Sequence, residues 1–193
     1  LSGSNISPKL GALVHLTSQW SIFGNYAGGF RAPNATQING FVENPTPTTF
    51  VRLLGNPDLK PEVSRNLEIG IRTHTDRLQL DIAAFSGRFN NLIVDKKPLG
   101  GAGVAGDPLL FQTVNVNRAK IQGFEVRGNF DWGVVAEGTL GTSVAYGQTR
   151  GADRDTGLAL NSIDPAKLAL GIKYERADWD IRFSKRDLEN ADL

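Results

Sequence analysis

The sequence contains no cysteine and no methionine, and only two of its 193 residues are histidines. Without cysteine there is no disulfide framework and no thiolate site. No apolar run approaches the roughly 20 residues that a membrane-spanning helix needs. The formal net charge is +1, whereas a nucleic-acid-binding surface requires a strongly basic face. Nucleic acid is therefore not expected among the partners.

A period of two runs through the sequence. Leu67, Ile69 and Ile71, for example, alternate with polar residues, and about eight segments of about ten or more residues follow this pattern. The pattern predicts an all-β, antiparallel sheet. Strands of this length suit a tilted membrane strand, whereas strands of soluble proteins average about five or six residues. A soluble sandwich alternates in the same way and is the less favoured alternative.

Short and long connections alternate along the chain. Tight turns are predicted at residues 17–19, 74–77, 131–133 and 176–178, and long loops at about 31–62, 91–115 and 150–161. This arrangement is typical of outer-membrane β-barrels, whose short turns lie in the periplasm and whose long loops lie outside. An open sheet would leave unpaired edges that a bilayer does not tolerate. We therefore expect a section of a transmembrane β-barrel in the bacterial outer membrane.

All three tryptophans, Trp20, Trp132 and Trp179, fall at predicted tight turns. Tryptophan prefers the boundary between membrane and water, where its ring is half apolar and its N–H finds a polar partner. We predict that the three form an aromatic girdle in contact with outer-membrane lipid, at the end of the sheet opposite the long loops.

Both ends of the sequence favour a fragment of a larger barrel. The N-terminus lacks the basic segment and apolar stretch of a signal peptide, which an outer-membrane protein needs. Residues 185–193 are polar and do not form the aromatic-ended last strand usual in such barrels. Eight strands could close as a small barrel, but the long loops and the missing ends favour part of a larger one.

Three motifs resemble those of TonB-dependent receptors. They are Gly29-Phe30-Arg31-Ala32-Pro33, Asn56-Pro57-Asp58-Leu59-Lys60-Pro61-Glu62 and Asn117-Arg118-Ala119-Lys120-Ile121-Gln122-Gly123-Phe124-Glu125. The resemblance implies a 22-stranded barrel with a plugged lumen, of which residues 1–193 supply part of the wall and its loops, without the plug. It also implies active uptake driven by the TonB complex through that plug, and no enzymatic activity.

The first two motifs contain a pair of boxes, Phe30-Arg31-Ala32-Pro33 and Asn56-Pro57-Asp58-Leu59, associated with the haem and haemoglobin receptors of this superfamily. Leu160-Asn161-Ser162-Ile163-Asp164-Pro165-Ala166-Lys167-Leu168 resembles the same branch. The resemblance implies uptake of haem, or of haem from haemoglobin, with haem as transported substrate and no cofactor bound by the fragment. A ferric siderophore is the alternative, because receptors for several iron and cobalt ligands share the boxes. A structural or adhesive barrel is a further alternative. The ligand-loop candidates are Phe30, Arg31, Ala32, Pro33, Asn56, Pro57, Asp58 and Leu59.

The boxes also have a purely structural interpretation. Pro33 can end a strand because it does not donate to the ladder, and Asn56-Pro57-Asp58 has the composition of a turn. On this interpretation the boxes fix the loop conformation and do not touch the substrate.

The sequence departs from the haem branch at one place. Haem iron takes His, Met, Cys or Tyr as its protein ligand, and haem receptors often carry a His between the two boxes, but residues 34–55 contain none. His15 and His74 are predicted at the periplasmic rim, and the three tyrosines at lipid-facing positions. No metal ligand or catalytic residue is therefore assigned. An iron ligand would come from missing segments, or the loops would recognise a carrier protein.

Other loop segments offer alternative chemistry. Asp153, Arg154 and Asp155 could bind a cation, although a solvated acidic loop is favoured. Residues 100–103 (Gly-Gly-Ala-Gly) could cradle a phosphate, but the Lys-Ser/Thr ending and the following helix of such sites are missing. Residues 109–111 either contact a flat ligand or form the upper rim of a strand.

Overall fold

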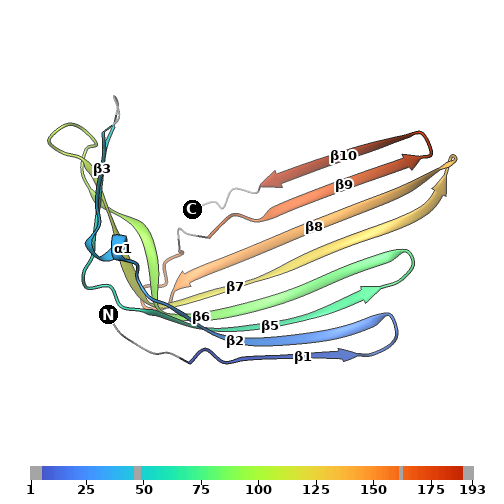
Figure 1. Ribbon diagram of the computed structural model, residues 1–193, viewed down its shortest axis with the longest axis horizontal. Coiled ribbons are helices and arrows are strands. Elements are labelled where there is room, and N and C mark those ends of the chain that lie inside the picture. Colours follow the sequence, from blue (N-terminus) through green and yellow to red (C-terminus); the bar gives the residue numbers. More distant parts are fainter. Residues whose placement is uncertain (1–5, 46–48, 161–162, 189–193) are drawn as a thin grey trace.

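The computed structural model describes residues 6–45, 49–160 and 163–188. Eight strands form a curved sheet, which we call the wall, in the order β1-β2-β5-β6-β7-β8-β9-β10, and each neighbouring pair is antiparallel (Figure 1). Their bounds are β1 (Lys9–His15), β2 (Trp20–Arg31), β5 (Glu62–His74), β6 (Leu78–Gly100), β7 (Leu109–Val135), β8 (Gly138–Asp153), β9 (Lys167–Arg176) and β10 (Trp179–Leu188). The predicted all-β antiparallel sheet is thus confirmed. Among the described residues, no helix is long and apolar enough to cross a membrane.

One face of the wall, the outward face, is apolar. Residues paired across strands share a face, and one such row is Ile22–Ile71–Ile82–Val126. No packed core covers this face, since Ile69 in the adjacent row is 58% exposed. The buried apolar residues of the described chain lie at the long-loop end and are Leu59, Leu92, Ile93, Ala119 and Leu160. The outward face is therefore suited to lipid and not to the interior of a soluble sandwich.

The other face of the wall, the inner face, is polar. Arg72 Nε donates to Asp81 Oδ1 across β5 and β6 at 2.5 Å. His15 Nδ1 and Ser21 Oγ are hydrogen-bonded across β1 and β2 at 2.9 Å. At these strand pairs, the predicted alternation therefore places polar and charged side chains on the inner face, opposite the apolar rows of the outward face.

Two of the short turns are built in the same way. Thr17 Oγ1 accepts hydrogen bonds from the N–H groups of Gln19 at 3.1 Å and Trp20 at 3.0 Å, and Thr75 Oγ1 accepts one from Leu78 N–H at 2.9 Å. A threonine hydroxyl that satisfies nearby backbone donors favours a tight turn. These turns lie where the sequence predicts them.

The turn between β7 and β8 lies further along the chain than predicted. Residues 131–133 form a β-bulge, in which Gly133 has φ +79° and its N–H donates to Asp131 Oδ1 at 2.7 Å. The chain reverses instead at Ala136 and Glu137, with φ of 47° and 70°. The prediction of a turn at 131–133 was wrong because a bulge uses the same positive-φ glycine as a turn.

Ala136→Gly is expected to stabilise the complete protein by about 1 kcal/mol, because a left-handed conformation costs a non-glycine residue roughly 1–2 kcal/mol. Urea unfolding of the refolded protein measures the change. Ala145→Gly, within β8, is the matched control and should destabilise the protein. A destabilising effect at both positions would contradict the left-handed turn.

The strand registers place all three tryptophans near the short turns. Trp20 pairs with Thr73, Trp179 pairs with Arg176, and Trp132 lies at the bulge of β7. Their positions at one end of the wall follow the predicted topology. Their contact with the membrane interface stays a prediction.

The predicted long loops contain more regular structure than expected. Residues 31–62 include α1 (Ala35–Asn39), β3 (Phe41–Pro45) and β4 (Phe50–Leu54). Most of residues 91–115 are strand, because β6 has 23 residues and β7 has 27. β8 likewise continues to Asp153. The long connection predicted at 91–115 is therefore mostly an extended hairpin, since β6 and β7 continue well past the roughly 9–11 residues that a membrane requires.

A small mixed sheet stands at the long-loop end of the wall (Figure 1). β3 and β4 form an antiparallel pair, and β4 then pairs in parallel with the first residues of β7. We call β3, β4, residues 92–100 of β6 and residues 109–116 of β7 the projection. It places strand side chains, and not only loop backbone, above the wall.

Candidate functional site

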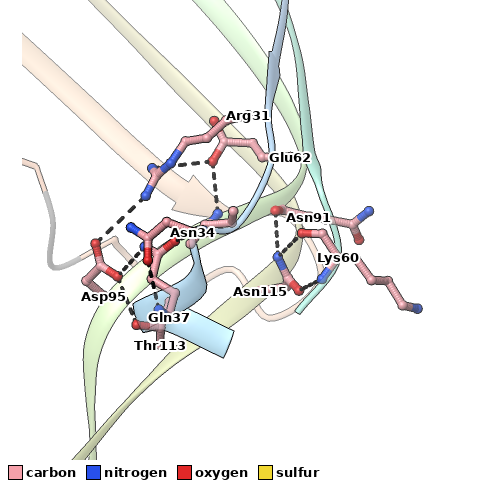
Figure 2. A network of polar contacts seen from close by, with 10 residues as sticks. Arg31, Asn34, Gln37, Lys60, Glu62, Asn91, Asp95, Thr113 and Asn115 are labelled. Atoms are coloured by element: carbon pink, nitrogen blue, oxygen red, sulfur yellow. Dashed lines mark hydrogen bonds and ion pairs between the residues drawn. The ribbon is translucent and has the colours of Figure 1, made fainter. Parts of the chain in front are cut away.

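The two boxes meet where the long loops leave the wall. The ladder between β2 and β5 ends at the pair Arg31–Glu62, so the first box adjoins the end of the second motif. Figure 2 shows the polar contacts at this point, which link α1 with the ends of several wall strands. We call this group the loop-base network, and it consists of Arg31, Asn34, Gln37, Lys60, Glu62, Asn91, Asp95, Thr113 and Asn115.

Asn56 organises the second box. Its side-chain oxygen accepts from Asp58 N–H at 3.1 Å, and its Nδ2 donates to the carbonyl of Thr113 at 3.0 Å. Leu59 is only 4% exposed, whereas Pro57 and Asp58 are exposed. Asn56 and Leu59 therefore hold the loop, and Pro57 and Asp58 remain accessible to a ligand.

The first box is divided between different surroundings. Phe30 lies on the outward face, apart from the other candidates, while Pro33 is buried and Ala32 is exposed. Asn34 then begins α1 with a capping box, in which Asn34 Oδ1 accepts from Gln37 N–H at 2.8 Å and Gln37 Oε1 accepts from Asn34 N–H at 3.0 Å. β2 thus ends at Arg31, two residues before Pro33, close to where the structural interpretation of the box places the end of a strand. The helix that follows Asn34 was not predicted.

Arg31 lies between two carboxylates. Its guanidinium nitrogens are 3.9 Å from Glu62 and 3.9 Å from Asp95. Glu62 is nearly buried, and its Oε2 also accepts from Ile93 N–H at 2.9 Å. Asp95 Oδ1 accepts at 2.9 Å from two further side chains, Gln37 Nε2 and Thr113 Oγ1. Because a half-exposed ion pair contributes at most about 1 kcal/mol, these hydrogen bonds hold the carboxylates more firmly than Arg31 does.

Asn115 on β7 connects β6 with the segment just before β5. Its Oδ1 accepts from Lys60 N–H at 2.8 Å, and its Nδ2 donates to the carbonyls of Lys60 at 3.0 Å and Asn91 at 2.8 Å. The side-chain amide thus satisfies both backbone groups of Lys60, as a neighbouring strand would. Asn91 has φ 53°, a left-handed conformation that asparagine tolerates. The start of β5 is therefore attached to both β6 and β7 (Figure 2).

Sequence reasoning did not identify Asp95, Thr113 or Asn115. The three come from the second long loop, and each has at least one partner in the first one. The sequence indicates only one of them, because Asn115 lies just before the motif that begins at Asn117.

The acidic loop forms a turn. Asp153 Oδ1 accepts from the N–H groups of Asp155 at 2.8 Å and Thr156 at 3.3 Å, and the bond from Asp155 is the main reason that the pKa of Asp153 lies below its usual value. Asp155 in turn accepts from Arg118 Nε at 2.6 Å. In the part of the chain that the structure describes, no group of three or more His, Cys, Asp or Glu could hold a metal ion. The solvated-loop interpretation is favoured.

The glycine-rich segment closes the hairpin between β6 and β7. Ala102 N–H donates to Asp107 Oδ2 at 3.0 Å, and Gly103 N–H donates to the carbonyl of Asp107 at 2.8 Å. Because Asp107 takes these donors, they do not cradle a phosphate. Residues 109–111 begin β7 and pair with β4, so the strand-rim interpretation of this segment is correct.

No described His or Tyr is placed to bind haem iron at the long-loop end. His15 ends β1 and His74 ends β5, both at the short turns. Tyr26, Tyr146 and Tyr174 belong to rows of the outward face. In the segment 160–168, residues 161 and 162 lie outside the described residues. The hydrogen bonds of the loop-base network connect α1 and Lys60 with β6 and β7.

Residues 1–191 match the family model "TonB dependent receptor-like, beta-barrel". The "Probable hemoglobin and hemoglobin-haptoglobin-binding protein 4" of Haemophilus influenzae is 30% identical over 167 residues, which are 79% of this chain and 16% of that protein. The vitamin B12 transporter BtuB of Vibrio vulnificus is 37% identical over 81 residues, which are 42% of this chain and 12% of that protein. The chain thus spans less than a fifth of the length of either relative.

The copper transporter OprC has a solved structure with a TM-score of 0.74 at 20% identity, covering 93% of this chain and 26% of that chain. This likeness shows the fold alone. Members of the matched family are receptors of the outer membrane and not enzymes. The family model covers nearly the whole chain, which therefore belongs to the TonB-dependent receptor-like β-barrel family.

Proposed function

We propose that the complete protein takes up haem across the outer membrane, chiefly from haemoglobin, and that this chain supplies part of its wall and ligand-binding loops. The observation that carries the proposal is the 30% identity to a probable haemoglobin-binding protein over 79% of this chain. Coupling to the TonB complex belongs to the same proposal and would run through a plug outside these residues.

The geometry supports recognition of a carrier protein more than coordination of free haem. Both histidines lie at the short-turn end, whereas the projection exposes apolar and aromatic side chains. Phe41 is 60% exposed, and the Arg52 guanidinium lies over its ring at 5.3 Å. Aromatic and arginine side chains carry much of the binding energy in protein interfaces. Phe41 and Arg52 are therefore proposed as contacts for haemoglobin.

Equilibrium binding to the complete refolded receptor tests the substrate. Haemoglobin and haemin are compared with a panel of ferric siderophores and with cyanocobalamin, which is included because of the identity to the vitamin B12 transporter. Saturable haemoglobin binding supports the proposal. If the receptor bound a siderophore or cyanocobalamin but neither haemoglobin nor haemin, the proposed substrate would be wrong. The family assignment would be unchanged.

The double substitution Phe41→Ser and Val42→Ser is expected to weaken haemoglobin binding at least tenfold, or about 1.4 kcal/mol, because it removes two exposed apolar side chains from β3, the edge strand of the projection. Surface plasmon resonance with the immobilised receptor measures this change. Val134→Ser is the control, because Val134 is 80% exposed at the short-turn end. Unchanged binding after the double substitution would exclude the side chains of Phe41 and Val42 on β3 as the contact.

A further inference from the structure

Three basic residues stand side by side on the outward face. The pairing of β5, β6 and β7 places Arg65 opposite Arg88 and Arg88 opposite Lys120. Arg150 on β8 lies in the next row, opposite Gln122. We call Arg65, Arg88, Lys120 and Arg150 the basic patch, which extends across four neighbouring strands.

The basic patch continues the apolar surface of the wall. Arg65 is two residues beyond Leu67, and Arg150 is four residues beyond Tyr146, in unbroken registers. Because side chains alternate between the faces of a strand, each basic residue lies on the same side as these apolar residues. The patch therefore borders the outward apolar face on its long-loop side, where a barrel wall leaves the hydrocarbon and enters the outer headgroup layer.

The charges of the patch have no partners among the ion pairs of residues 6–45, 49–160 and 163–188. Directly opposed residues have Cβ atoms only about 4.5–5.5 Å apart, and like charges at such positions are destabilising. The contrast with the inner face is clear, since Arg72 there faces Asp81. Arg118, in the row beyond the patch, is likewise paired with Asp155.

We propose that the basic patch binds the phosphate groups of a phosphorylated lipid in the outer leaflet of the outer membrane. Arginine guanidinium groups match phosphate oxygens with two parallel hydrogen bonds, and several anionic oxygens offset the repulsion among the four cations. A lipid fits better than a soluble anion, because its acyl chains can lie on the adjoining apolar rows while its phosphates reach the patch. The lipid then attaches to the wall just below the projection.

Binding of diphosphorylated lipid A to the complete receptor in detergent tests the proposal. The double variant R65Q/R88Q is expected to bind this lipid at least tenfold more weakly than the unchanged receptor. The matched control is K96Q/K97Q, which removes two positive charges further along β6 and should change binding less than twofold. Equal binding by R65Q/R88Q and the unchanged receptor would overturn the proposal.

Thermal unfolding in the same detergent provides a second measurement. Without lipid, R65Q/R88Q should melt at the same or a higher temperature, because like charges are removed; this also shows that the variant folds. Lipid A should raise the melting temperature of the unchanged receptor more than that of the variant. Lipid A stripped of its phosphates and inorganic phosphate should both fail to do so. Equal stabilisation by inorganic phosphate would indicate a soluble-anion site and contradict binding of a lipid.

Discussion

Ile69→Arg is expected to destabilise the membrane-inserted receptor by about 2–4 kcal/mol, the cost of an arginine on the lipid face near the bilayer midplane. Ile69 lies in the middle of the apolar stretch of β5, between Leu67 and Ile71, and is paired with Gly24 and Ala84. Neither of these paired residues carries a group that could neutralise a charge there. Urea unfolding of the receptor refolded into phospholipid vesicles, followed by tryptophan fluorescence, measures the loss.

The control for this prediction is Asn25→Arg. Asn25 lies on the inner face of the neighbouring strand, opposite Glu68, so the new guanidinium has water and a carboxylate within reach. We expect its effect to stay below about 1 kcal/mol, as for an exposed charge. Similar losses at the two positions would mean that both faces of the wall have the same environment, and the lipid-facing assignment would have to be abandoned.

Asn115→Ala is expected to release the base of the first long loop and to reduce ligand binding while the wall stays folded. The substitution removes three hydrogen bonds that connect β7 to Lys60 and Asn91. At about 0.5–1.5 kcal/mol for each bond, the local loss is about 2–4 kcal/mol. Hydrogen exchange at the amide of Lys60 in the complete receptor should become faster by at least tenfold.

Asn117→Ala is the matched control, because it changes the same residue type two positions along β7 at an exposed site. Its effect on the amide of Lys60 should be negligible. If Asn115→Ala left both the exchange rate and haemoglobin binding unchanged, the loop-base network would not support the binding loops. A general loss of protection across β5 to β8 would instead assign Asn115 to the stability of the wall.

The wall was predictable because its physical basis is local. Alternation within a single strand indicates which of its residues share a face. Ile69 and Glu68 could therefore be assigned to opposite faces without knowledge of any neighbouring strand. The short turns were predictable for the same reason where a threonine organised them, as at Thr17 and Thr75. At Gly133 the local signal was ambiguous, because a bulge and a turn require the same backbone conformation.

The long-loop end was much less predictable because its contacts are not local. Asp95 is fixed by Gln37 and Thr113 from two different segments, and nothing in the sequence near Asp95 indicates either partner. The boxes did locate the base of the loops correctly. The sequence did not indicate which residues of the boxes are structural and which are accessible. In the structure, Leu59 and Pro33 are buried, whereas Pro57 and Asp58 are exposed.

The parallel pairing of β4 with β7 also constrains the order in which the protein can form. The strands from β5 to β10 each pair with the next strand along the chain, so they can associate step by step through local closures. Residues 51–54 of β4, in contrast, pair with residues 109–112 of β7, and a parallel pair cannot close through a hairpin. β4 can therefore pair with β7 only after β6 and β7 have formed their hairpin. We therefore expect the wall to assemble first, so that a folding intermediate already inserted in the membrane still lacks its binding surface.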